Sequence, residues 1–222
     1  MHIHSHQHEA PAQTEGRLIR WAGQYDFFTN LMTFGHIGML RSMTVDKAML
    51  KPGESVLDVG CGTGGVTLPA KQRIGEEGIA AGIDPAPEMI AVARQKAQRA
   101  GLEIDFRVGV IEALPFPDAS FDAVTSSLMM HHLPAQLQVS GLAEIFRVLK
   151  PGGRIFIADI LRPSTSPVKR FFTSMIFHHG HVADSGLEDL LILLQNAGFT
   201  DVEQLKERFL IIGFVRAQKP VS

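Results

Sequence analysis

The chain has 222 residues, a length typical of one domain that can bury a hydrophobic core without disulfides or metal ions. Its 21 Lys and Arg residues against 23 Asp and Glu residues give a net charge of −2, so the composition offers no basic surface for nucleic acid. Cys61 is the only cysteine, which excludes an internal disulfide and favours a reducing compartment.

Residues 1–20 are predicted to be a disordered tail rich in histidine. His2, His4, His6 and His8 alternate there, in a segment that has nothing apolar to bury. Weak metal chelation by these histidines is the alternative interpretation. No apolar run reaches the length of about 18 residues that spans a bilayer, and the first residues lack the layout of a signal peptide. We therefore expect a cytoplasmic protein without a membrane span.

Residues 56–65, with the sequence VLDVGCGTGG, predict a buried strand that turns sharply and then opens a helix. The apolar residues suit a central parallel strand over 55–59, and the glycines at 60, 62 and 64 let the backbone turn and approach a ligand closely. A second apolar run, residues 79–83, ends at Asp84 about 20 residues after this turn, where a carboxylate can accept hydrogen bonds from both ribose hydroxyls. This pattern is shared by NAD sites and S-adenosylmethionine sites.

Two details favour S-adenosylmethionine over a dinucleotide. The spacing is Gly-x-Gly-x-Gly in place of Gly-x-Gly-x-x-Gly, and Asp58 stands inside the strand just before the glycines. A dinucleotide needs the helix N-terminus open to its pyrophosphate. S-adenosylmethionine has no phosphate, so the glycines would make room for its methionine and ribose portions.

The rest of the chain alternates strands and helices, which predicts an α/β fold with a doubly wound sheet. Pro87 marks the first turn of one helix and Gly101 its end. A capping box at residues 185–188 opens a later helix that ends at Gly198. Further helices are expected from residue 64 or 65 to about 74 and over 135–149, and further strands at about 103–108, 121–127, 154–159, 201–208 and 210–218.

Five segments, taken in order, resemble the class I S-adenosylmethionine-dependent methyltransferases, and among them the small-molecule group that includes the ubiquinone/menaquinone-biosynthesis C-methyltransferases. The segments are residues 56–65, 82–90, 109–116, 121–132 and 149–159. The resemblance extends from about residue 25 to residue 219. It implies an enzyme with one methyltransferase domain over 21–222, a Rossmann-like seven-stranded sheet and an antiparallel C-terminal edge hairpin.

The resemblance also assigns cofactor-binding residues to the carboxyl ends of the strands, where ligands bind in open parallel sheets. Asp84 would bind the ribose, with a helix N-cap as its alternative role, and Asp58 would either bind the methionine portion or order the loop. Val110 lies at the adenine, where many relatives have an Asp or Asn that accepts a hydrogen bond. Glu112 would replace that acceptor through a shifted loop or be a solvated acid near the rim. The remaining assignments are Gly60, Cys61, Gly62, Thr63, Pro85, Ile111, Ser126 and Ser127.

The expected reaction is an in-line attack on the methyl carbon of a sulfonium, which depends mainly on alignment and desolvation. A general base is needed only if the acceptor holds a proton, and His131 and His132 are the candidates, with His131 preferred. Their alternative role is to pack and hydrogen-bond the next helix. Tyr25 matches a family tyrosine near the cofactor carboxylate, with simple packing as the alternative. The quinone-biosynthesis enzymes have Arg-Asn in place of the two histidines, which disfavours quinone precursors.

The acceptor pocket is expected to come from an N-terminal helical cap over residues 21–50 and a lid insertion over 161–184. Both are rich in Phe and Met, which suits a small apolar or aromatic metabolite; ordinary helix core faces are the alternative. Exposed apolar surface on either segment would favour a homodimer. No metal is expected, because His178, His179 and His181 lack the acidic or Cys partners of a zinc site.

Two other functions stay open at this point. One is a cofactor-binding protein without methyl transfer, either regulatory or a catalyst of a rearrangement, and the other is a protein methyltransferase. The sequence does not identify the acceptor atom.

Overall fold

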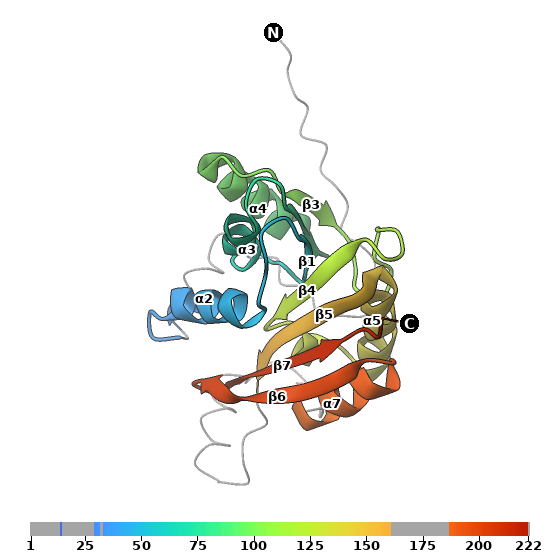
Figure 1. Ribbon diagram of the computed structural model, residues 1–222. Helices are drawn as coiled ribbons and strands as arrows, with labels where there is room; N and C mark the ends of the chain where they lie inside the picture. The colour runs from blue at the N-terminus through green and yellow to red at the C-terminus, as the bar shows by residue number, and fades with distance from the viewer. Residues whose placement is uncertain (1–13, 15–28, 32, 161–186, 222) are drawn as a thin grey trace.

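The computed structural model describes residues 14, 29–31, 33–160 and 187–221. Seven strands in these residues form one mixed sheet in the order β3-β2-β1-β4-β5-β7-β6 (Figure 1). Strands β1 to β5 are parallel, whereas β7 runs antiparallel to both β5 and β6. The predicted α/β fold and its antiparallel edge hairpin are confirmed. The strands are β1 Ser55–Val59, β2 Ile79–Asp84, β3 Asp105–Val108, β4 Phe121–Ser127, β5 Leu149–Ile160, β6 Thr200–Phe209 and β7 Ile212–Gln218.

Helices cover both faces of this sheet. Because successive strand residues point to opposite faces, Leu57 and Ile157 pack in a cluster with α5 and α7, whereas Val56 and Phe156 pack in another with α2 and α3. Helix α4 packs through Ile90 against β3. The sheet is therefore buried on both sides, as expected for parallel strands. The helices are α2 Ile37–Lys47, α3 Thr67–Ile74, α4 Pro87–Ala100, α5 Ala135–Val148 and α7 Leu187–Asn196, with a short 3₁₀ helix η1 at Met130–His132.

Helix α4 begins and ends where the sequence predicts. Pro87 occupies the first helical turn, where its missing N–H had no helical partner, and Gly101 ends the helix with a left-handed φ of 66°. Helix α3 differs from the prediction because it begins at Thr67 and not at residue 64 or 65. Gly62 and Gly64 have φ values of 52° and 79°, so the chain is still turning there and cannot yet be helical.

Strand β5 begins at Leu149, five residues before the predicted start at Arg154. Leu149 pairs with Phe121 and Arg154 pairs with Ala123, and the register shifts between these two pairs. The segment with Gly152 therefore bulges out between two paired stretches of one strand. Local sequence signals indicate a turn here, and only the pairing with β4 shows that the strand continues through it.

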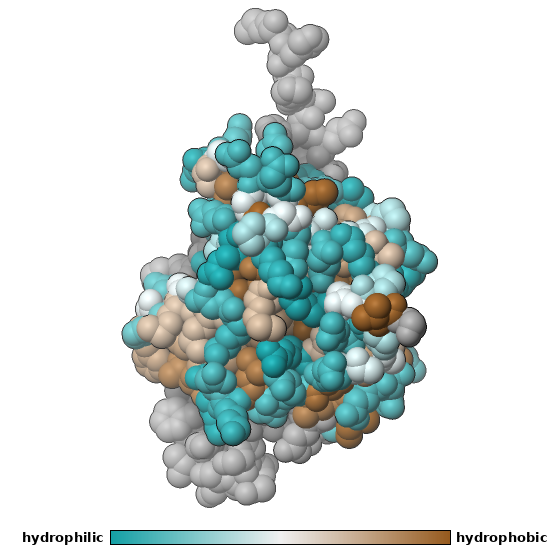
Figure 2. All heavy atoms as spheres, in the orientation of Figure 1, coloured by the Kyte–Doolittle hydropathy of each residue, from teal (hydrophilic) through white to brown (hydrophobic). Residues whose placement is uncertain are grey.

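Several predicted features lie outside the described residues. They are the tail over 1–20 apart from Thr14, the first part of the cap over 21–50, the lid insertion over 161–184, Tyr25 and the start of the capping box. In the part of the chain that is described, no helix combines the length and apolar character needed to cross a bilayer. On the face seen in Figure 2, hydrophilic residues predominate and hydrophobic residues appear in small groups.

The turn between α3 and β2 is closed by a buried lysine. Lys71, in the last turn of α3, is 8% exposed. Its Nζ donates hydrogen bonds to the carbonyl oxygens of Gly75, Glu76 and Gly78 at 3.1, 3.1 and 2.5 Å. A cation near a helix C-terminus also interacts favourably with the helix dipole. Lys71 thus determines how the chain leaves α3 and enters β2, the strand that ends at Asp84.

Replacing Lys71 with Met should destabilise the protein by roughly 2 kcal/mol, because the apolar stem is kept while three carbonyl groups lose a charged donor. Urea unfolding measures this change. The same substitution at the exposed Lys51 is the matched control and should have little effect. Equal losses for the two variants would contradict the assigned role of Lys71.

Candidate cofactor site

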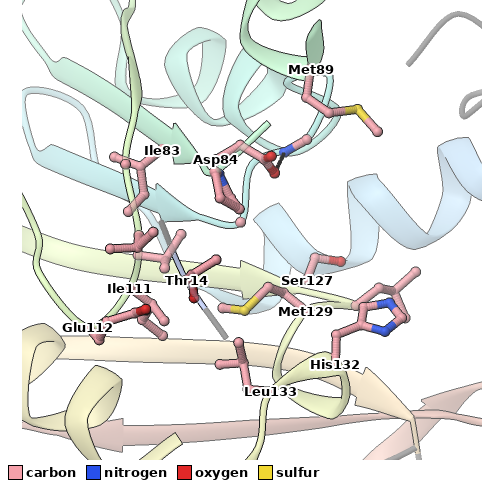
Figure 3. Close-up of a pocket in the computed structure, with 17 residues that line it drawn as sticks. Thr14, Ile83, Asp84, Met89, Ile111, Glu112, Ser127, Met129, His132 and Leu133 are labelled. Atoms are coloured by element: carbon pink, nitrogen blue, oxygen red, sulfur yellow. Dashed lines mark hydrogen bonds between the residues drawn. The ribbon is translucent and has the colours of Figure 1, made fainter. Parts of the chain in front are cut away.

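The candidate site lies where the direction of winding of the sheet reverses. The chain passes from β1 outward to β2 and β3, and then returns to β4 on the other side of β1. Open α/β sheets bind ligands at such a switch point, beyond the carboxyl ends of the strands. A pocket lies there in this structure (Figure 3). Its lining includes seven of the predicted cofactor residues, Gly60, Gly62, Asp84, Pro85, Val110, Ile111 and Ser127.

A second pocket lies on the other side of the glycine turn. Asp58, Cys61 and Thr63 line it together with Gly60, Gly62 and Ser127, which the two pockets share. Ser126 is not in the lining of either pocket. Its side chain is fully buried, and its hydroxyl has no partner among the described residues. Ten of the eleven predicted cofactor residues thus line one or both of two pockets that share Gly60 and Gly62, and Ser126 is buried outside both linings.

The glycine turn is held tightly between β2 and the loop after β4. The backbone N–H groups of Gly60 and Cys61 both donate to the carbonyl oxygen of Ile83 at 2.9 Å. Gly60 has a φ of 72°, and a Cβ at this position would lie 2.4 Å from Cγ of Met129. Met129 therefore packs directly onto the turn and lines the first pocket. Met129 lies within the segment 121–132, but no role is predicted for it from the sequence.

Asp84 is oriented by two backbone groups. Its Oδ2 accepts a hydrogen bond from the N–H of Gly62 and its Oδ1 accepts one from the N–H of Ala86, both at 3.0 Å. Each carboxylate oxygen can accept a further bond. Burial raises the pKa of Asp84 to about 6. The alternative interpretation as a helix N-cap is wrong, because the N-cap of α4 is Ala86.

Asp58 is buried below the turn with an exposed fraction of 2%. Its Oδ1 accepts a hydrogen bond from Thr125 Oγ1 at 2.8 Å, and its Oδ2 accepts one from Thr67 Oγ1 at 2.6 Å. Burial raises the pKa of this carboxyl to about 6, although the two threonine bonds oppose the shift. These bonds tie β1 to β4 and α3, and Asp58 also lines the second pocket, so both predicted roles stay open.

The two adjacent histidines have different surroundings. The side chain of His131 is 8% exposed, and its Nδ1 lies 2.5 Å from Oδ1 of Asp159. The backbone N–H of His131 donates to the other oxygen of Asp159 at 3.2 Å. His132 lines the first pocket, and its ring centroid lies 3.9 Å from that of His131. The preferred candidate, His131, is thus absent from the lining of this pocket, which contains His132.

The fold and this site define the class I, Rossmann-like methyltransferase architecture. Residues 56–153 match the family described as the methyltransferase domain. This match and the two relatives described next support a class I S-adenosylmethionine-dependent methyltransferase.

Two relatives support this identification. The chain is 28% identical over 204 residues to the ubiquinone/menaquinone biosynthesis C-methyltransferase of Salmonella arizonae, covering 82% of this chain and 80% of that one. It is 32% identical over 159 residues to the enzyme of the same name from Erwinia tasmaniensis, covering 71% and 62%.

The solved structures support the fold alone. A methyltransferase from Aquifex aeolicus superposes with a TM-score of 0.64 at 23% identity, covering 80% of this chain and 88% of that one. The [4+2]-cyclase SpnF superposes with a TM-score of 0.66 at 23% identity, covering 83% and 81%.

The buried Asp58 should make stability depend on pH in a particular direction. Because its pKa is about 6 when folded and near 3.8 when unfolded, the unfolded chain releases the proton first as the pH rises. Asp58 therefore lowers the free energy of unfolding between about pH 4 and pH 6, by at most about 3 kcal/mol. As the pH rises from 4 to 7, the free energy of unfolding of the wild type should fall relative to that of Asp58→Asn.

Urea unfolding at several pH values measures this difference. Other carboxyl groups titrate in the same range, but they are common to both proteins and cancel. The exposed Glu103, changed to Gln, is the control. The difference in free energy of unfolding between the wild type and this variant should not depend on pH. A constant difference for Asp58→Asn would show that its pKa is not raised.

Proposed function

We propose that this enzyme transfers the methyl group of S-adenosylmethionine to a small apolar or aromatic metabolite. The observation that carries this proposal is the apolar wall of Leu128, Met129 and Leu133, which lies beside Ser127 and His132 in the first pocket. Apolar walls with few polar groups are typical of small-molecule sites. The relatives named above act, by their names, in quinone biosynthesis. His131 and His132 replace the Arg-Asn of that group, so we do not extend their substrates to this chain.

The residues of the site fit the cofactor. Asp84 offers two oriented acceptors for the ribose hydroxyls, and Pro85, Val110 and Ile111 offer an apolar slot for the adenine. We assign the methionine portion to the second pocket, beside Asp58, the backbone from Gly60 to Gly62, Cys61 and Thr63. Ser127, which lines both pockets, would then lie between the two ends, with Ser126 behind it. The acidic side chains suit a cofactor that carries positive charge.

Bound S-adenosylmethionine supplies an electrophilic methyl group on a sulfonium. The chain's own contribution is alignment and exclusion of water, because a charge that disappears in the transition state needs little stabilisation. Met129 and Leu133 provide an apolar surface for the acceptor. A ring nitrogen of His132 would take the proton from an acceptor oxygen or nitrogen, whereas His131 would hold η1 in place through Asp159. Tyr25, outside the described residues, stays a candidate on resemblance.

A panel of small metabolites tests the proposed function. Each is incubated with enzyme and methyl-labelled cofactor, and both labelled product and demethylated cofactor are measured. We expect labelled product with apolar or aromatic acceptors. Labelled peptide or protein would support protein methylation, and cofactor binding without labelled product from any acceptor would support a binding protein.

Binding of demethylated cofactor, S-adenosylhomocysteine, should depend on the ionisation of Asp84. Hydroxyl donors favour the ionised carboxylate, whose pKa is about 6 before binding. Affinity should therefore be constant above about pH 7 and fall by up to about tenfold per pH unit below 6. Asp84→Asn should bind at least about tenfold more weakly at pH 7.5, because hydrogen bonds to a charged group contribute about 1.5 to 3 kcal/mol each.

Calorimetric titration from pH 5 to pH 8 measures these affinities. Asp118→Asn, at an exposed site, is the control and should match the wild type. Wild-type affinity at Asp84→Asn would overturn the assignment of the ribose to Asp84.

The two histidines should respond differently to replacement by alanine. For an acceptor that holds a proton, His132→Ala should lower kcat by about 10² to 10⁴-fold with unchanged cofactor affinity and melting temperature. His131→Ala should lower the melting temperature, because the buried Asp159 loses the imidazole and keeps only the backbone N–H groups of residues 131 and 160 as donors. Turnover measured on an acceptor from the panel, together with thermal unfolding, separates the two roles. The opposite result would restore His131 as the base.

A further inference from the structure

Pro85, Val110 and Ile111 line the part of the first pocket that the proposed placement gives to the adenine. Adenine carries an exocyclic amino group, and burying this donor without a partner costs free energy. Neither Val110 nor Ile111 has a polar side chain to meet it. An enzyme that uses S-adenosylmethionine would then need another acceptor near this end of the pocket, and the described residues contain one.

Glu112 lines the same pocket, and its Oε2 is buried with no hydrogen-bond partner among the described residues. Glu112 as a whole is half-buried, and this one carboxylate oxygen is withdrawn from solvent. In Figure 3, Glu112 and His132 lie at opposite ends of the pocket. A buried carboxylate oxygen without a partner is costly and calls for an explanation, such as a ligand that supplies the donor.

The loop that carries Glu112 is fixed on both sides. The N–H of Gly109 donates to the carbonyl of Asp84 at 3.1 Å, which ties the loop to the end of β2. The N–H of Leu114 donates to Glu144 Oε2 at 2.8 Å, and Arg147 pairs with Glu144 on α5. Val110 and Ala113 bridge the two ends of this short loop. The Glu112 carboxylate is therefore held on a loop anchored to β2 and α5.

We infer that Glu112 accepts a hydrogen bond from the exocyclic amino group of adenine and so sets the base specificity of the cofactor site. This inference rests on the proposed placement of the cofactor. A carboxylate is an acceptor only, so it pairs with the amino group of adenine and repels the carbonyl oxygen that hypoxanthine has at the same position. Charge-assisted bonds of this kind are stronger than neutral ones. Asp84 would then bind the ribose and Glu112 the base.

Calorimetric binding of S-adenosylhomocysteine and S-inosylhomocysteine tests the inference, since these ligands differ only in the base. Wild type should prefer the adenine ligand by at least about 30-fold, because a site built around a hydrogen bond strongly rejects the analogue without it. Glu112→Ala should reduce this preference to about threefold or less by weakening the adenine ligand. Glu112→Gln should also reduce the preference for the adenine ligand by about tenfold, because the glutamine amide can donate a hydrogen bond to the hypoxanthine oxygen.

The exposed Glu103, changed to Gln, is the matched control and should keep the wild-type preference. Melting temperatures confirm that each variant is folded. Equal weakening of both ligands by Glu112→Ala, or no change in either, would overturn the role of Glu112 and leave the proposed function standing. Failure of the wild type to bind either ligand would instead overturn the proposed cofactor placement and the inference with it.

Discussion

The buried carboxylate of Asp58 is the interaction on which the site depends. It joins three elements, because Asp58 lies in β1, Thr125 in the adjacent β4 and Thr67 in the first turn of α3. Asp58 and Thr125 are also register partners in the sheet. A carboxylate this deeply buried persists in a fold only when its oxygens are hydrogen-bonded. The two threonines therefore tie the end of β1 to β4 and to the first turn of α3, and the glycine turn spans the space between β1 and α3.

The arrangement of the site follows from this turn. Its outer backbone is held by Ile83 and by Asp84, so the end of β2 and the end of β1 form one unit. Asp58 lines the second pocket and Asp84 lines the first. Burial raises the pKa of both carboxyl groups. Glu112 adds a third acid at the far end of the first pocket. In a chain with a net charge of only −2, acids gathered in this way favour a positively charged ligand over a phosphate.

Much of the fold could be predicted because its signals are local. Pro87 and Gly101 bound α4 through their own backbone preferences, and Asp84 follows an apolar run that ends where β2 ends. Two predicted boundaries were wrong, one because pairing with a distant segment decides it and one because of the backbone angles in the glycine turn. Strand β5 begins at Leu149 because Phe121 pairs with it, although Gly152 indicates a turn. Helix α3 begins late because two glycines before it take left-handed backbone angles.

The sequence by itself determined the fold class and the methyl donor. The features that indicate the cofactor lie within short stretches of sequence. They are the spacing of the glycines, the acid inside β1 and the acid at the end of β2. Only the tertiary structure decided which neighbouring side chains reach the pocket. His132 lines it while His131 turns to Asp159, 28 residues further along the chain. Met129 packs on Gly60, and one oxygen of Glu112 is buried. These positions depend on contacts between distant segments. Two adjacent histidines have the same local sequence signal, so the sequence does not show which of them reaches the pocket.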